Sequence, residues 1–131
     1  MKYFTIEELT RSDTATTRGL DNTPTPEIKA NLERLVDKVL DPLREKYGKP
    51  ITVNSGYRCP ELNKAVGGSK TSDHVKGFAA DLTGGSKQEN EKIFNIIRDN
   101  FAWTQLINER DFSWVHVSYD PNRIKNQVLK M

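Results

Sequence analysis

The sequence predicts an α+β fold, in which a small antiparallel sheet packs with helices in a single domain. Two observations support this class: helical periodicity precedes and interrupts the strand-like segments, and those segments are few and short. A third is the length, because 131 residues match the usual size of one domain. We expect an N-terminal arm over residues 1–25 and a core over residues 26–131.

The N-terminal arm combines a short helical signal with a turn-rich stretch. Thr5 and Glu8 have the spacing of a capping box, which marks a helix start. Residues 11–25 are rich in Thr, Ser, Asp and Asn, which favour turns and local side-chain hydrogen bonds over regular structure. We therefore expect this arm to lie over the core as irregular chain.

A long amphipathic helix is predicted at the start of the core. Thr25 and Pro26 suit the N-cap and the first turn. Apolar residues then recur at spacings of three and four up to Tyr47, which is typical of one helix face. Pro42 is expected to kink this helix or end it early, and Gly48 is expected to close it.

Short strands and two further helices account for the rest of the chain. Helices are expected over residues 60–66 and after Ser86, which forms a second capping box with Glu89. The expected strands cover residues 51–57, 78–82, 104–108 and 113–119.

Composition excludes several classes of protein. Twenty basic and eighteen acidic residues are interspersed, so we expect no nucleic-acid partner. No apolar run approaches the ~18–20 residues of a membrane span. The first residues include acids where a signal peptide has an apolar segment, so we expect the chain to be cytoplasmic at synthesis. We also expect a monomer.

Both histidines of the chain lie in contexts that suit metal ligation. His74 precedes Asp81 by seven positions, and Gly77 between them allows a tight turn. His116 lies in an alternating pattern, so a neighbouring strand can bring it to the same point. Two imidazoles and one carboxylate are a common zinc set that leaves a fourth position for water. The alternative to a metal site is that both histidines are ordinary core or surface residues and that Asp81 is an acid in a turn.

Three sequence blocks occur in order between residues 55 and 118. They read SGYR at residues 55–58, S-x-H-x-x-G-x-A-x-D at residues 72–81 and WVHVS at residues 114–118. Together they resemble the M15 peptidases, the zinc D-Ala-D-Ala carboxypeptidases, close to subfamily A. Members of that family include phage endolysins and bacterial cell-wall peptidases.

The resemblance implies a zinc metallopeptidase that hydrolyses amide bonds in the peptide stem of peptidoglycan, with sheet and helices around a zinc cleft. It implies one zinc ion held by His74, Asp81 and His116. The D-Ala-D-Ala carboxypeptidase and the L-Ala-D-Glu endopeptidase reactions both remain open. Action at the bacterial cell wall is implied, and a phage-encoded enzyme would depend on another protein for its release.

The resemblance also implies residues that contact the substrate. Arg58 matches an arginine beside the metal that holds the substrate carbonyl or the developing oxyanion, which gives it a catalytic and a substrate-binding role. Ser72 matches a serine of the second block. Gln105 and Trp114 are expected to line the cleft.

The general base is where the sequence departs from the family pattern. Many members place an acid three positions before the last histidine ligand, and this chain has Ser113 there. A serine cannot accept a proton near neutral pH without another base. Glu109 ends a predicted strand and is our preferred base, and Asp111 is the alternative.

Two other functions remain open. Ser113 at the usual acid position is compatible with a non-catalytic, zinc-stabilised module that binds the cell wall. A peptidase that uses Cys59 with one of the histidines is the second alternative, although a packing role suits that cysteine better.

Overall fold

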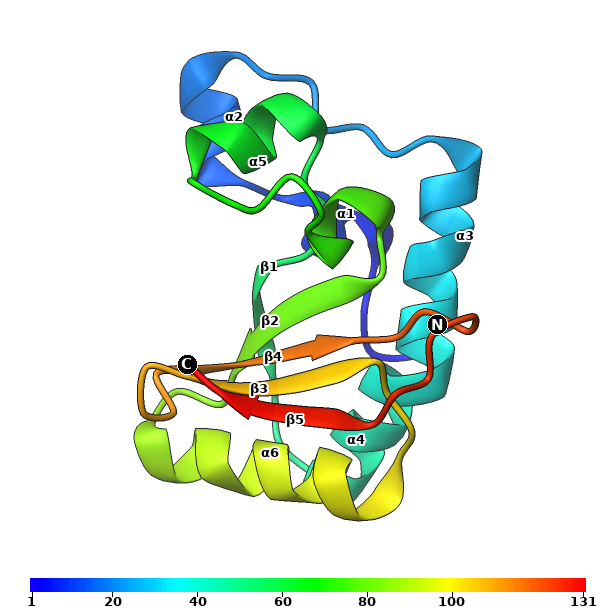
Figure 1. Ribbon diagram of the computed structural model, residues 1–131, viewed down its shortest axis with the longest axis vertical. Helices are drawn as coiled ribbons and strands as arrows, with labels where there is room; N and C mark the ends of the chain where they lie inside the picture. Colours follow the sequence, from blue (N-terminus) through cyan, green and yellow to red (C-terminus); the bar gives the residue numbers. More distant parts are fainter.

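A five-stranded sheet lies at the centre of the computed structural model, which describes residues 1–131 (Figure 1). Its order is β1-β2-β4-β3-β5, and every neighbouring pair is antiparallel except β3 and β5. The strands are β1 (Thr52–Ser55), β2 (Ala79–Thr83), β3 (Gln105–Glu109), β4 (Trp114–Ser118) and β5 (Gln127–Lys130).

The α+β class is confirmed, and the four predicted strands form, but the sheet is mixed because of β5. Ser118 at the end of β4 pairs with Gln105 at the start of β3. The following loop brings Gln127 to the same Gln105, so β5 must run in the direction of β3. Strand β5 has only four residues, three of them exposed, and this explains why no sequence pattern marked it.

Six α-helices and two short helical turns surround the sheet. The α-helices are α1 (Ile6–Thr10), α2 (Asp13–Arg18), α3 (Pro26–Leu35), α4 (Asp41–Tyr47), α5 (Pro60–Ala65) and α6 (Lys87–Asn100). The predicted caps Thr5, Thr25 and Ser86 each accept a hydrogen bond from the backbone N–H three residues on. None of the helices has the length and hydrophobicity that a transmembrane segment needs.

The expectation of irregular chain after residue 10 is wrong for α2. The Ser12 side chain accepts from the backbone N–H of Ala15, which supplies an N-cap, and Ala15 is buried. Gly19 ends the helix in the left-handed conformation. Burial of one small residue and two caps therefore give regular structure to a stretch whose composition favours turns.

The predicted long helix is interrupted just before Pro42, which itself lies in the first turn of α4. A π-helical turn, Val36–Leu40, joins α3 to α4, and the N–H of Asp41 donates to the carbonyl of Val36. Proline lacks an N–H and its ring collides with the carbonyl four residues back, so a wider turn ahead of it removes the conflict. The chain continues as α4 to Gly48, which ends it as predicted.

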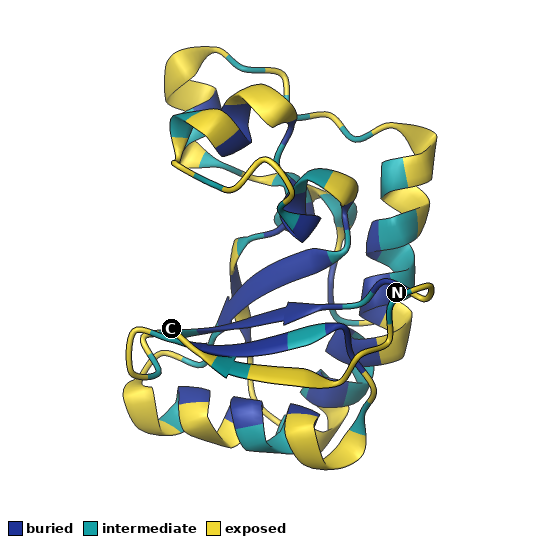
Figure 2. Ribbon diagram, viewed as in Figure 1, coloured by how far each residue is buried: buried dark blue, intermediate teal, exposed yellow.

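The two faces of the sheet have different roles. Ala80, Leu82, Val115 and Val117 face the helices and belong to the apolar core, together with Ile93 and Ile97 of α6 and residues of α3 and α4. Figure 2 shows the central strands buried and the helices buried on one side only. The alternate residues of β2 and β4, among them Asp81 and His116, face the opposite side.

Candidate metal centre

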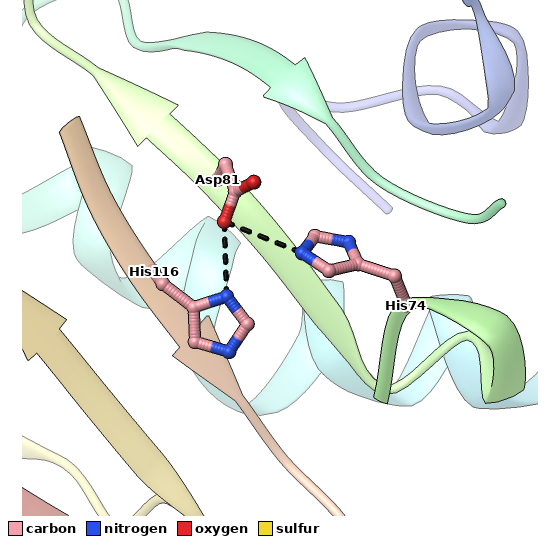
Figure 3. Close-up of side chains that lie close together, drawn as sticks. All are labelled: His74, Asp81 and His116. Atoms are coloured by element: carbon pink, nitrogen blue, oxygen red, sulfur yellow. Dashed lines mark hydrogen bonds and ion pairs between the residues drawn. The ribbon is translucent and has the colours of Figure 1, made fainter. Parts of the chain in front are cut away.

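Three buried side chains converge on the sheet face opposite the apolar core (Figure 3). One ligand atom from each of His74, Asp81 and His116 lies within 4.8 Å of the others. Nδ1 of His116 is 2.9 Å from Oδ1 of Asp81, and Nε2 of His74 is 3.3 Å from the same oxygen. The residues that the sequence predicted to share one point therefore do so.

Strand pairing positions two of the three residues. Asp81 in β2 and His116 in β4 are directly opposite each other in the antiparallel ladder. Side chains opposite each other point to the same face, and their Cβ atoms lie ~4.5–5.5 Å apart. The alternation of apolar and polar residues around His116 therefore places its side chain on the same face as Asp81 and in contact with it.

A short 3₁₀ turn, η2 (Asp73–Lys76), positions the third residue. Ser72 caps this turn, since its Oγ accepts from the backbone N–H of His74 at 3.2 Å. Gly77 ends the turn with φ of +76°, and a Cβ there would lie 2.9 Å from the carbonyl oxygen of Ile28. Glycine is thus required at this position, because both the conformation and the close approach exclude a side chain.

The hydrogen bond of His74 to the backbone orients its imidazole. Nδ1 of His74 lies 2.7 Å from the carbonyl oxygen of Gly56, so Nδ1 carries a proton and donates to it, and Nε2 is directed toward Asp81. Histidine ligands of metal ions are commonly oriented in this way by a partner on the other ring nitrogen.

Asp81 is ionised in this environment. Burial alone would raise its pKa, but the hydrogen bonds to the rings of His116 and His74 outweigh burial and hold the pKa of Asp81 well below its usual range. An ionised carboxylate is what metal coordination requires.

The donor set fits a divalent metal ion such as zinc. Zinc takes imidazole nitrogen and carboxylate oxygen in tetrahedral sites, where ligand atoms ~2.1 Å from the ion lie roughly 3.4 Å apart. The separations of 2.9 and 3.3 Å and the limit of 4.8 Å are close to this arrangement. Three protein ligands leave a fourth position for water or substrate.

Arg58 lies beside the group, as predicted. Its Nη2 is 3.5 Å from Oδ2 of Asp81, and its Nε donates to Oγ of Ser55 at 3.0 Å. Burial lowers the pKa of Arg58, and the charge of Asp81 partly offsets this shift.

Asn63 also holds this guanidinium and was missed by sequence reasoning. Its Oδ1 accepts from Nη1 of Arg58 at 3.2 Å, and its Nδ2 donates to the carbonyl of Ser69 at 2.8 Å. A Cβ at Gly68 would lie 2.1 Å from Oδ1 of Asn63, so the loop approaches as closely as glycine allows. A single asparagine in a helix carries no signal that could have identified this contact.

A cavity of about 400 Å³ adjoins the group on the Arg58 side. It lies between residues 11–14 of the arm, strand β1 and helix α5, and it reaches Ser55 and Arg58. Eight of its twelve lining residues are polar or charged, so the cavity offers hydrogen-bond partners to a ligand with amide or charged groups.

The two candidate bases differ in where they lie. Glu109 ends β3 opposite Trp114, on the sheet face that carries His116, and it is partly exposed, although it is not one of the three grouped residues. Asp111 lies in the β3–β4 turn, where Nζ of Lys87 in α6 is 2.5 Å from its Oδ2. This ion pair lowers the pKa of Asp111 and directs it toward α6.

Ser113, at the position where the family pattern has an acid, is exposed and donates from Oγ to the carbonyl of Arg110 at 2.7 Å. Ser113 therefore stabilises the turn after β3.

The predicted substrate contacts lie in different surroundings. Trp114 shares the face of His116, with the guanidinium of Arg110 5.4 Å from its ring centroid. Gln105 donates from Nε2 to Oε1 of Gln127 in β5 at 3.0 Å. Ser72, as the cap of η2, accepts from the backbone N–H of His74.

Cys59 is buried and caps α5. Its Sγ accepts from the N–H of Leu62 at 3.4 Å, and it lies outside the group that brings both histidines together. This contact supports the packing role over the nucleophilic one.

Comparison with known proteins agrees with the arrangement of these residues. Over 85 residues the chain is 40% identical to the zinc D-Ala-D-Ala carboxypeptidase of Streptomyces albus G, a match that covers 64% of this chain and 32% of that protein. The chain thus spans about a third of the length of this relative. The family model described as Peptidase M15 matches residues 2–118, which is most of the chain and includes the whole of the His-Asp-His group. The chain therefore belongs to the M15 peptidase family.

Proposed function

We propose that the protein is a zinc metallopeptidase that hydrolyses amide bonds in the peptide stem of bacterial peptidoglycan. The observation that carries this proposal is the buried His74, Asp81 and His116 group in a member of the M15 peptidase family. The similar Streptomyces protein, named as a zinc D-Ala-D-Ala carboxypeptidase, supports both the metal and the substrate class. The site of action would be the bacterial cell wall.

In this proposal the three grouped residues hold the zinc ion. When bound, zinc would activate water as a nucleophile and polarise the scissile carbonyl. Glu109 accepts the proton of the attacking water and returns it to the leaving amine. A carboxylate suits this role, because the chain has no histidine outside the metal group.

Arg58 stabilises the negative charge that develops on the carbonyl oxygen. Its guanidinium is already oriented by Ser55, Asn63 and Asp81, so little reorganisation is needed when the charge forms. The stem peptide would bind in the cavity that reaches Ser55 and Arg58, with Trp114 and Gln105 further along the sheet face.

Removal of the terminal D-Ala is the reaction that we favour, on the strength of the 40% identity to the Streptomyces carboxypeptidase. The decisive experiment is digestion of purified peptidoglycan and of a pentapeptide ending in D-Ala-D-Ala, followed by mass analysis. Parallel samples contain a chelator, a chelator followed by zinc, or a thiol-alkylating reagent.

Release of D-Ala that stops with the chelator and returns with zinc is the expected result. Fragments with a new N-terminal D-Glu would identify the endopeptidase reaction instead. Binding to the wall without any cleavage would contradict the enzymatic proposal and favour a binding module. Activity that resists the chelator but is lost on alkylation would implicate Cys59.

A further inference from the structure

A cluster of three charged side chains connects the C-terminal segment to the turn that carries His74. Nη2 of Arg123 donates to Oδ1 of Asp73, fifty residues away in the sequence. Nε of Arg123 donates to Oδ2 of Asp120 at 2.7 Å. We refer to Asp73, Asp120 and Arg123 as the C-terminal clamp.

Both carboxylates of the clamp are buried and need a cationic partner. Asp73 is 8% exposed and Asp120 is 7% exposed. A buried carboxylate without compensating charge or hydrogen bonds is strongly unfavourable. Arg123 is the cation that contacts both of them, and its planar guanidinium suits bridging between two acids.

Asp120 provides a fixed point for the clamp. Its backbone N–H donates to Oγ1 of the fully buried Thr104 at 2.8 Å, just ahead of β3. Its Oδ1 also accepts from the N–H of Asn122 at 3.0 Å. Asp120 follows the end of β4 by two residues, so its position is tied to the strand that carries His116.

Asp73 is the other end of the clamp: it belongs to the four-residue turn η2 and directly precedes His74. A helix this short has few internal contacts to fix its orientation. Arg123 therefore connects the element that carries His74 to the strand that carries His116. The spacing of the two imidazoles, whose ring centroids are 5.2 Å apart, depends on how these two elements are held.

We propose that Arg123 is a positioning residue that sets the metal affinity by holding η2 so that His74 faces Asp81 and His116. The inference rests on the proposed metal-binding function of that group. Arg123 lies beyond residues 2–118, the part that matches the family model, so family membership does not assign this role. The C-terminal segment thus contributes to the site without touching metal or substrate.

The test compares zinc affinities, measured by competition with a chromophoric chelator, in the wild type and three variants. Arg123→Ala is expected to weaken zinc binding by about 10-fold, the lower end of the range for direct hydrogen-bond partners of metal ligands, because Arg123 acts on His74 through Asp73. Arg123→Lys should restore part of the affinity, because it keeps the charge but not the planar double contact. Arg98→Ala is the matched control, since Arg98 forms an exposed pair with Asp99 and should bind zinc like the wild type.

Two further readouts separate positioning from general stability. The absorption spectrum of the cobalt-substituted protein reports ligand geometry and is expected to change in Arg123→Ala. Thermal unfolding of the metal-free protein reports the fold. Wild-type affinity and an unchanged cobalt spectrum in Arg123→Ala would overturn the proposal, even if the variant were less heat-stable.

Failure of the proposed function would look different. A wild-type protein that binds no zinc would contradict the metal centre itself and not the clamp alone. If Arg123→Ala does not fold, Arg123→Gln and Arg123→Lys decide the question: weakened zinc binding in both supports the positioning role, and wild-type binding in both refutes it.

Discussion

At the scale of single residues, Asp81 connects the two histidines of the candidate metal centre to the arginine beside them. Its Oδ1 faces both imidazoles, and its Oδ2 faces the guanidinium of Arg58. Because the guanidinium of Arg58 contacts Oδ2, Oδ1 stays free to coordinate a metal ion. The carboxylate of Asp81 therefore orients both the arginine and the two imidazoles.

His116→Ala tests the metal centre most directly. The variant loses one of three ligands, so its zinc affinity should fall by more than the ~10–100-fold that the loss of an outer partner costs. Metal analysis after gel filtration should find it largely without zinc, and hydrolysis of the pentapeptide should drop to background. The exposed variant Asp99→Ala should keep metal and activity, and retention of both by His116→Ala would show that the site is elsewhere.

Glu109→Gln tests the general base. The amide cannot accept a proton, so kcat should fall by about 10²–10⁴-fold, the usual contribution of general acid–base catalysis, while zinc content stays at the wild-type level. Asp111→Asn is the matched control and should retain kcat, because Asp111 pairs with Lys87. Unchanged kcat in Glu109→Gln together with a loss in Asp111→Asn would reverse the assignment.

At the scale of elements, a polar cluster joins the end of α4 to the start of α6. The carboxylate of Glu89 accepts from the hydroxyl of Tyr47 at 2.5 Å and from Nζ of Lys49 at 2.6 Å, and Lys92 lies at 3.0 Å. These contacts, with that of Lys49 the largest, lower the pKa of Glu89 from 4.5 to about 2. Burial, and then the same carboxylate, raise the pKa of Tyr47 to about 12.

The lowered pKa of Glu89 predicts a pH-dependent contribution to stability. Because the folded-state pKa lies below the unfolded value of 4.5, the contribution is complete above that pH and is lost as the pH falls toward about 2. Urea unfolding of the wild type and Glu89→Gln should therefore differ at pH 6, and the difference should shrink between pH 5 and pH 2. A difference that stays constant over that range would contradict the ionic origin of the contribution.

At the scale of the whole molecule, the parts that local pattern determines were predictable and the parts that depend on distant contacts were not. Strand alternation at His116 and the glycine turn after His74 are local, and they made a shared point with Asp81 a candidate, which the family resemblance then favoured over ordinary histidines. Strand β5 and the clamp arginine Arg123 depend on partners about twenty and fifty residues away. The residues next to these partners carry no pattern that indicates the pairing. Periodicity and capping rules therefore cannot predict either contact.

A zinc ion bound by the three grouped residues would connect three separate elements of the fold. The three residues come from η2, β2 and β4, so a bound ion joins the 3₁₀ turn to two central strands, a geometry that the unfolded chain lacks.

Free zinc at 100 times its dissociation constant should therefore stabilise the protein by about 2.7 kcal/mol. For a domain of 131 residues, with an unfolding entropy of about 2.1 cal/mol/K per residue, that corresponds to a rise in Tm of roughly 10 °C, and a chelator should reverse it. The measurement is differential scanning calorimetry of apo and zinc-loaded protein, with His116→Ala in parallel. Equal Tm values for the apo and zinc-loaded wild type would mean that zinc does not bind between these elements, whereas a rise in the wild type that His116→Ala lacks ties the stabilisation to this group.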